Sequence, residues 1–197
     1  MKFDTGTEAP QRLEASTYPA RIVGVIDLGT QRREFDNKES FVRQLVLQFE
    51  FPTETFVDQD GKVAARLLGA FYTASLNPKA TLRKHLEQVR GKAFTQEELA
   101  GFDVKNLLGV NVTATVVMNS NGKPKISNVA GPMKGSTKFD KITEHVFFDL
   151  DEYDATVYEA LPEFFKSIIA DSPEYIKATT APKTELEQIH EELGNLF

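Results

Sequence analysis

Apolar and polar residues alternate along residues 41–51 (FVRQLVLQFEF). Side chains of a strand point alternately to its two faces, so this pattern predicts a strand with one buried face. The polar side carries Gln44, Gln48 and Glu50, and Arg43 is the one exception on the apolar side. The apolar side carries Phe41, Leu45, Leu47, Phe49 and Phe51.

Two further apolar segments flank this strand. Residues 18–28 (YPARIVGVIDL) and 65–76 (ARLLGAFYTASL) are rich in residues that favour strands, and each contains a glycine, where a strand often bulges or coils. The glycines are Gly24 and Gly69. Asp60-Gly61 is a strong turn signal between the second and third segments. We predict three strands, the last two joined as a hairpin, with a polar loop over residues 29–40.

Helical spacing replaces the alternation between residues 77 and 108. A helix is predicted from Asn77-Pro78 to about Val89, because apolar residues recur there at three and four positions and Gly91 supplies a stop. Thr95 and Glu98 have the spacing of a capping box for a short helix, and Asp103 can cap one further turn. The apolar positions of the first helix are Leu82, Leu86 and Val89.

Two strands follow the helical segment. Residues 110–119 (VNVTATVVMN) and 125–129 are predicted strands joined at Asn121-Gly122. Three strands, a helical insert and two more strands are the order of a five-stranded barrel of the oligonucleotide/oligosaccharide-binding (OB) type. We therefore predict a mainly β protein with α-helices: an OB barrel over residues 17–135, with its helical insert between strands three and four.

The segments outside the predicted barrel differ from it in composition. Residues 1–16 are predicted to be an extended arm, and residues 136–178 a helical extension that packs on the barrel. Within this extension, Pro162 must break or kink the helical pattern of residues 155–169. Residues 179–197 are predicted to be a linker and an acidic C-terminal tail or helix. This last segment has a capping-box spacing and a narrow apolar stripe at Thr184, Leu186, Glu187, Ile189, Leu193 and Leu196.

Composition narrows the possible chemistry. The chain has no cysteine, which excludes disulfide scaffolds, thiolate metal sites and cysteine nucleophiles. Its apolar runs, such as residues 22–26, are far shorter than the roughly 20 residues that span a bilayer, and its start shows no signal-peptide pattern. We expect a cytoplasmic protein of one compact domain with appended segments.

Charge is distributed unevenly along the chain. Residues 1–141 carry 20 Lys and Arg against 16 Asp and Glu, a net charge of +4, whereas residues 142–197 carry 3 against 13, a net charge of −10. Such a division is compatible with a body that meets a polyanion and an acidic tail that competes for the same surface or recruits another protein. Solvated faces without a partner would give the same pattern.

No catalytic signature is present. The chain contains no phosphate-binding glycine loop, no H-E-x-x-H and no G-x-S-x-G, so we expect no enzymatic activity and no cofactor. One carboxylate cluster could hold Mg²⁺ for phosphodiester hydrolysis, or it could simply complement the positive end of a helix dipole. Its members are Asp149, Asp151, Glu152 and Asp154.

Basic residues interleaved with aromatic residues are the most informative candidates for a site. In OB folds, cations of the loops follow the phosphates while aromatic rings stack on bases. Tyr72 and Phe35 are the better candidates for stacking, and Phe49 and Phe51 the poorer ones. The predicted nucleic-acid-binding residues are Arg32, Arg33, Phe35, Lys38, Arg43, Arg66, Tyr72, Lys123 and Lys125.

Several segments resemble one protein family. Residues 71–117, beginning FYTASLNPKATLRKHLEQVRG, and residues 121–135 (NGKPKISNVAGPMKG) are similar to small bacteriophage OB-fold proteins that bind single-stranded DNA during replication and recombination. Residues 18–31 and 161–175 extend the likeness, which departs at Val89, where we would expect tryptophan. The resemblance implies sequence-independent binding of single strands without a metal or nucleotide cofactor, in the cytoplasm of the host cell.

The end of the sequence has a second likeness. It resembles the acidic tails of bacterial and phage single-stranded DNA-binding proteins, which finish in phenylalanine, and here Phe197 follows Glu191 and Glu192. The resemblance implies that Leu193, Leu196 and Phe197 contact a replication or recombination protein. A helix for packing or oligomerisation is an alternative for this segment.

Two other functional classes stay open. An OB domain can serve as a protein–protein adaptor in replication or recombination, in which case the loop arginines would be dispensable and an apolar surface would matter. A metal-dependent nuclease would require the carboxylates of residues 149–154.

Overall fold

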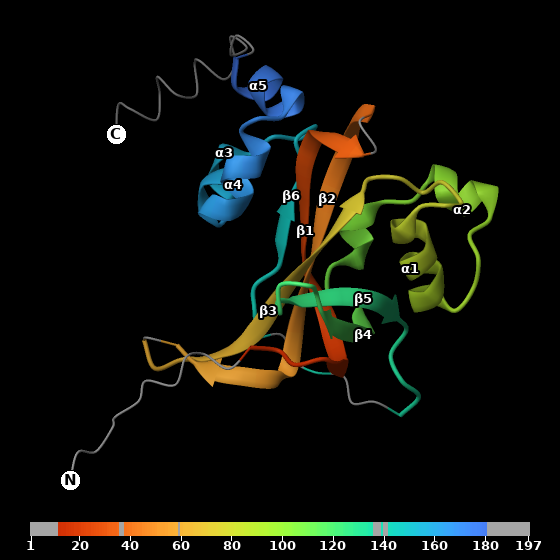
Figure 1. The fold of residues 1–197 in the computed structure, drawn as a ribbon, viewed down its shortest axis with the longest axis vertical. Helices are drawn as coiled ribbons and strands as arrows, with labels where there is room; N and C mark the ends of the chain where they lie inside the picture. Colours follow the sequence, from red (N-terminus) through yellow and green to blue (C-terminus); the bar gives the residue numbers. More distant parts are fainter. Residues whose placement is uncertain (1–11, 36–37, 59, 136–138, 140–141, 181–197) are drawn as a thin grey trace, which may run out of the picture.

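The computed structural model describes residues 12–35, 38–58, 60–135, 139 and 142–180. It is a mainly β structure with helices packed on both faces of a six-stranded sheet (Figure 1). The strands are β1 (Ser16–Phe35), β2 (Lys38–Val57), β3 (Val63–Thr73), β4 (Asn111–Met118), β5 (Pro124–Ala130) and β6 (Val146–Phe148). The helices are α1 (Thr81–Arg90), α2 (Gln96–Ala100), the 3-10 turn η1 (Val104–Leu107), α3 (Ala155–Ala160), α4 (Glu163–Ile169) and α5 (Pro173–Thr180).

The strands follow the order β3-β2-β1-β4-β5, and all pairs along this path are antiparallel. The short β6 pairs with β1 in parallel. Between the described residues of β3 and β5 no ladder forms, so the sheet is not closed there. The predicted β class and the helical insert between the third and fourth strands are confirmed, whereas β6 was not predicted.

Strand β1 is the centre of the sheet, because it pairs with β2, β4 and β6. Its register against β2 shifts between Ile22 and Gly24 and again between Asp27 and Gly29. These irregularities let one 20-residue strand coil from one partner to the next. The predicted irregularity at Gly24 is confirmed.

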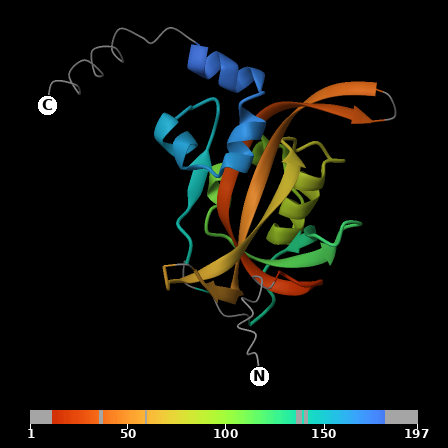
Figure 2. The same cartoon turned by 60° about the vertical axis from the view of Figure 1, so that its left-hand side comes forward.

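The predicted loop over residues 29–40 is wrong. Residues 29–35 continue β1 and residues 38–40 begin β2, and together they form a two-stranded arm that projects from the body (Figure 2). The arm carries charged residues on a hairpin with little burial, so alternation of apolar and polar residues gives no signal there. An exposed ion pair between Arg32 and Glu39 joins its two strands.

Two cores lie on opposite faces of β1 and β2. The helical insert covers one face, and α3, α4 and α5 cover the other. The first core includes Ile22, Val25, Leu45, Leu47, Phe49, Phe51, Tyr72, Leu82 and Leu86. The second consists of Ile26, Leu28, Val46, Phe148, Leu150, Tyr158, Leu161, Phe165 and Ile169.

The predicted helix signals have their expected roles. Thr95 Oγ1 accepts from the Glu98 amide at 3.2 Å while Glu98 Oε2 accepts from the Thr95 amide at 3.0 Å, which is a complete capping box. Gly91 ends α1 with a φ of 70°, a left-handed conformation that favours glycine. Pro162 separates α3 from α4, as the sequence predicts. The predicted capping box at residues 184–187 lies outside the described residues.

Candidate nucleic-acid interface

A groove of about 970 Å³ lies where β3 and β5 face each other without pairing. We call it the β3–β5 groove. The arm contributes one residue, the segment before α1 contributes several, and the β4–β5 hairpin forms one wall. Its lining residues are Arg33, Gly69, Ala70, Phe71, Tyr72, Thr73, Ser75, Asn77, Lys79, Ala80, Thr81, His85, Val117, Asn119, Pro124, Lys125, Ile126 and Ser127.

The lining of this groove is basic. Arg33, Lys79 and Lys125 reach it from three separate elements, and no aspartate or glutamate is among the lining residues. Arg33 extends from the arm towards β3, where its Nη1 lies 3.5 Å from Thr73 Oγ1. Three cations without a carboxylate give the groove a positive potential, which favours a polyanion.

The start of α1 adds donors to the same groove. Ala80 and Thr81 line it, and Ala80 caps the helix without a side-chain hydrogen bond. The first turn of α1 contains no acidic residue. Its free amide groups and the positive end of the helix dipole therefore reinforce the cations.

Phe71 supplies an aromatic surface that the sequence did not single out. Phe71 is 45% exposed and is one of the lining residues of the groove, and its ring packs against Phe164 and Phe165 of α4, with centroids at 6.2 and 6.5 Å. Contacts with these two rings hold Phe71 in place while leaving part of it free. A partly exposed ring of a residue that lines a basic groove is a candidate for stacking on a base.

The structure places Tyr72 in the core, which corrects its predicted role in stacking. Only 4% of Tyr72 is exposed, and its hydroxyl lies 3.0 Å from His85 Nδ1. Burial raises the pKa of Tyr72. Burial also lowers the pKa of His85, and the positive charge of Lys84 lowers it further by a smaller amount. The pair therefore forms an uncharged floor under the groove.

The lowered pKa of His85 predicts how stability depends on pH. The folded state favours neutral His85. The stability that this preference contributes is therefore fully present above the unfolded-state pKa of about 6.5, and it is lost as the pH falls below 6.5 through the lower pKa of the folded state. We expect the free energy of unfolding, measured with urea, to decrease between about pH 7.5 and pH 5. His85→Gln should flatten this dependence relative to the unchanged protein. Equal profiles for the variant and the unchanged protein would contradict the assignment.

The other predicted basic residues occupy different surroundings. Arg32 is paired with Glu39 on the arm, Lys38 is exposed where β2 begins, and Lys123 is exposed in the β4–β5 hairpin. Phe35 ends β1, and its side chain lies outside the described residues. The structure thus brings Arg33 and Lys125 together and leaves Arg32 engaged with a carboxylate.

Arg66 does not line the β3–β5 groove but a neighbouring hollow. Its guanidinium carbon is 5.4 Å from the centroid of the Phe56 ring, in a smaller hollow of about 280 Å³ that also includes Arg12. Pro124 lines both this hollow and the β3–β5 groove. The basic surface therefore continues along β3 towards residue 66.

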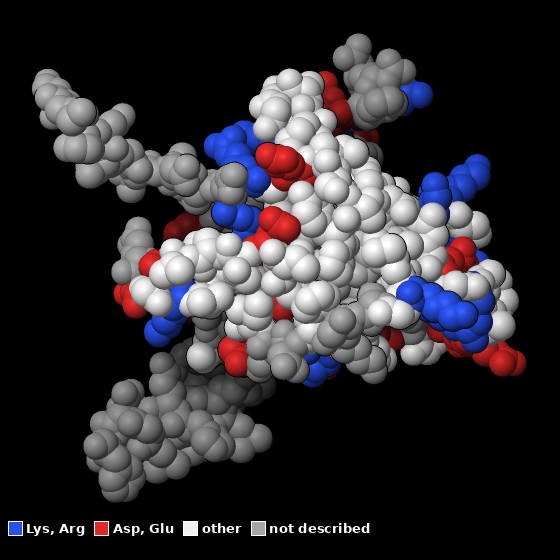
Figure 3. Space-filling model, turned by 90° about the horizontal axis from the view of Figure 1, so that it is seen from below, with Lys and Arg blue, Asp and Glu red and all other residues white. Residues whose placement is uncertain are grey.

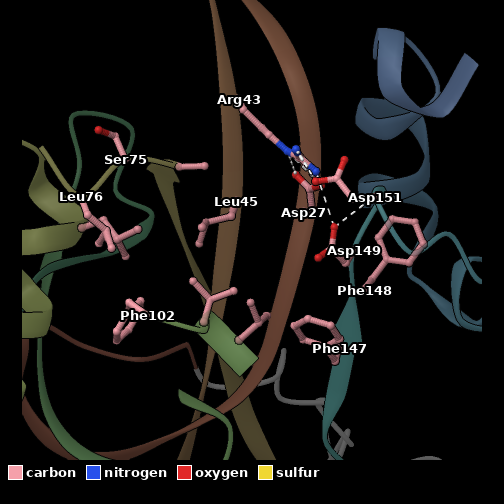
Figure 4. A pocket seen from close by; sticks show the side chains of 14 residues that line it. Asp27, Arg43, Leu45, Ser75, Leu76, Phe102, Phe147, Phe148, Asp149 and Asp151 are labelled. Carbon is pink, nitrogen blue, oxygen red and sulfur yellow. Dashed lines mark hydrogen bonds and ion pairs between the residues drawn. The ribbon is translucent and has the colours of Figure 1, made fainter. Parts of the chain in front are cut away.

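Arg43 does not belong to this basic surface. It lies at the edge of a separate pocket, where it contacts Asp27 at 2.5 Å, Asp151 at 2.8 Å and Asp149 at 3.5 Å (Figure 4). The hydrogen bond to Asp27 raises the pKa of Arg43, partly opposed by desolvation. A phosphate would have to displace carboxylates to reach Arg43, so the structure does not favour its predicted role in nucleic-acid binding, which stays a prediction.

The carboxylate cluster is likewise divided between structural roles. Asp149 and Asp151 face Arg43, while Asp154 caps α3 by accepting from the Thr156 amide at 2.8 Å. Among the residues the structure describes, no group of three His, Asp or Glu side chains is arranged to hold a metal ion. Asp154 therefore lies at the positive end of the α3 dipole, which is one of the two roles expected for this cluster.

On the face seen from below, the charged side chains of the described residues form several groups rather than one patch (Figure 3). Seen from below, basic residues form separate groups around a largely uncharged centre (Figure 3). Local arrangement in a groove, rather than overall charge, must therefore provide any binding of a polyanion, since the net charge is −6.

The predicted partner-binding residues Leu193, Leu196 and Phe197 lie outside the described residues. Within the described part of the chain, no helix combines the length and the apolar character needed to cross a membrane. Comparisons with family models, curated proteins and solved structures found no match to this chain.

Proposed function

We propose that the protein binds single-stranded DNA without sequence preference, in the β3–β5 groove, and that it does so without catalysing a reaction. The observation that carries this proposal is a groove with three cations, a partly exposed phenylalanine and no acidic residue in its lining. Cations that follow the backbone, together with a stacking ring, are the usual means of holding single strands.

The topology supports an OB-type interpretation of the fold. The strand order β3-β2-β1-β4-β5, with helices between β3 and β4, is that of an OB barrel opened between β3 and β5. In such barrels the ligand lies across strands two and three and between two loops. Here the arm and the β4–β5 hairpin stand in the places of those loops. Together with the family resemblance, this favours a role in phage DNA replication or recombination.

Fluorescence anisotropy provides the direct test. A labelled oligothymidine of about 30 nucleotides, which exceeds the roughly 4–16 nucleotides covered by one OB fold, is titrated at several salt concentrations. We expect binding that weakens linearly on a logarithmic salt scale, because bound cations release counterions. Unlabelled single strands should compete and duplex of the same length should not. Absence of binding at low salt by folded protein would overturn the proposal.

Phe71→Ala tests the stacking role. Loss of one stacked ring costs about 1–3 kcal/mol, so affinity for oligothymidine should fall roughly 5- to 150-fold. The salt dependence should stay unchanged, since no charge is removed. Phe41→Ala is the control, because Phe41 is 67% exposed but does not line the groove. Equal losses in both variants would contradict a specific role for Phe71.

A further inference from the structure

A second hollow, of about 320 Å³, lies between the sheet, the helical insert and β6 (Figure 4). We call it the Arg43 pocket. Its interior is apolar, and a group of charged side chains lies along one side. The apolar walls include Val25, Leu45, Leu82, Phe102, Val104 and Phe147.

The charged side of the Arg43 pocket is acidic. Its lining contains three carboxylates, of Asp27, Asp149 and Asp151, and one guanidinium, so the formal charge is −2. Arg43 donates three hydrogen bonds to Asp27 but one to Asp151, whose side chain is 67% exposed. Negative charge therefore remains available to a ligand at Asp149 and Asp151.

One wall already accommodates a cation. The Lys105 ammonium lies 5.0 Å from the centroid of the Phe147 ring, although Lys105 is not among the lining residues. The electron-rich face of an aromatic ring attracts positive charge, and the carboxylates add to that attraction. A polyanion is disfavoured here, in contrast to the β3–β5 groove.

We propose that the Arg43 pocket binds a partner protein through an apolar side chain next to a lysine or arginine. The volume lies near the lower end of ligand pockets, about 300 Å³, which suits one large apolar side chain. The basic neighbour of that side chain would meet Asp149 and Asp151. This proposal does not rest on DNA binding, since the chemistry of the two sites is opposite.

The two sites are adjacent. Ser75 lines both the Arg43 pocket and the β3–β5 groove. A partner seated in the pocket would therefore lie beside whatever the groove holds, with only the segment around Ser75 between them. The arrangement would place a partner protein next to a bound single strand.

Three capped dipeptides test the proposal on the full chain. N-acetyl-Phe-Arg-amide should cause saturable amide shifts of pocket residues in ¹⁵N-labelled protein. N-acetyl-Phe-Glu-amide, with the charge reversed, and N-acetyl-Gly-Arg-amide, without the apolar side chain, should each bind at least about tenfold more weakly. No saturable shifts for the first peptide, or equal affinity of the first two, would overturn the proposal.

Variants locate the binding. Asp149→Asn with Asp151→Asn keeps the Arg43–Asp27 pair and should bring the preference for Phe-Arg over Phe-Glu from about tenfold to near one. The control replaces Glu97 with Gln and Asp171 with Asn, two exposed residues outside the pocket, and should retain the preference. Equal losses of preference in both double variants would place the peptide elsewhere.

A filled pocket gives an independent measurement. Val104→Trp should abolish shifts with all three peptides, with circular dichroism confirming the fold. Oligothymidine titrations of the same variants separate the two proposals. The protein can bind oligothymidine without binding the peptide, or bind the peptide without binding oligothymidine. Undiminished peptide binding by a folded Val104→Trp variant would also overturn the pocket assignment.

Discussion

Replacing Arg33, Lys79 and Lys125 together by alanine should weaken oligothymidine binding by about 100-fold at roughly 0.1 M salt. Each cation that neutralises a phosphate contributes a slope of about 0.7 to the dependence of log affinity on log salt for single strands. Three such contacts give a slope of about 2. Between 1 M and 0.1 M salt, a tenfold change, they therefore raise the affinity by about 100-fold, and this gain is what the triple variant loses. Anisotropy titrations from low to high salt measure both quantities.

A control with the same change in charge makes this result specific. Lys62, Lys84 and Lys177 are exposed and none lines the groove, so their joint replacement by alanine should reduce affinity only slightly. If the two triple variants lost the same affinity and slope, attraction by overall charge would explain binding and the groove would not. Arg32→Ala should have less effect than Arg33→Ala, because Arg32 is already paired with Glu39.

Gly29→Ala should give the largest loss of stability among the substitutions considered. Gly29 has a φ of 69°, and an added Cβ would lie 2.5 Å from Ser172 Cβ and 2.9 Å from Glu174 Oε2. The substitution therefore combines backbone strain of about 1–2 kcal/mol with overpacking of about 1–3 kcal/mol. It also disturbs the anchor of α5, where Glu174 accepts hydrogen bonds from Thr30 N at 2.8 Å and Thr30 Oγ1 at 2.6 Å.

Gly61→Ala is the matched control for this prediction. Gly61 has a φ of 76° but nothing within 4 Å of an added Cβ, so only the backbone strain applies. Urea unfolding should show a smaller loss for Gly61→Ala than for Gly29→Ala. Ser172→Gly in the Gly29→Ala background should recover part of the difference, since the clashing Cβ is removed. Equal losses of stability in the two variants would show that α5 moves away from the added Cβ at residue 29 without further destabilising the protein.

Local signals in the sequence were sufficient to predict most helices and strands, but not which strands pair with one another. Thr95 and Asp103 each interact with backbone amides within three residues, so the sequence alone predicts their capping roles. Strand β6 has three residues and is held by pairing with Gly24–Ile26 of β1. A strand this short has no period of its own, and only distant residues stabilise it.

The sequence analysis selected Tyr72 for stacking, whereas its neighbour Phe71 is the exposed ring, and strand register explains the difference. From Phe51 to Thr55, β2 advances four residues while β3 advances one, from Arg66 to Ala65. An odd difference exchanges the faces of paired residues, so counting from the turn at Gly61 gives the wrong side. Beyond this irregularity Tyr72 pairs with buried Leu45, which places Phe71 on the opposite face. Pro52 lies inside this irregularity, and a proline within a strand is a local signal for a bulge, but it does not reveal by how many residues the register shifts.

Burial of the predicted polar side of β2 has a similar cause. Val46 and Glu50 are fully buried, although alternation puts them on the exposed face. Val46 contacts the second core, and Glu50 Oε2 accepts a hydrogen bond from the Thr143 amide at 2.5 Å. Both partners lie about a hundred residues further along the chain, so a local pattern cannot reveal that this face is covered.

The central place of β1 has a consequence for synthesis in the cell. Ile26 and Leu28 are covered in part by Ile169, which is synthesised about 140 residues after them. At about 5–20 residues per second, roughly 10–30 s pass before that cover leaves the ribosome. The apolar residues of β1 thus stay uncovered, and accessible to chaperones, for some time after they are synthesised, although this strand organises the sheet.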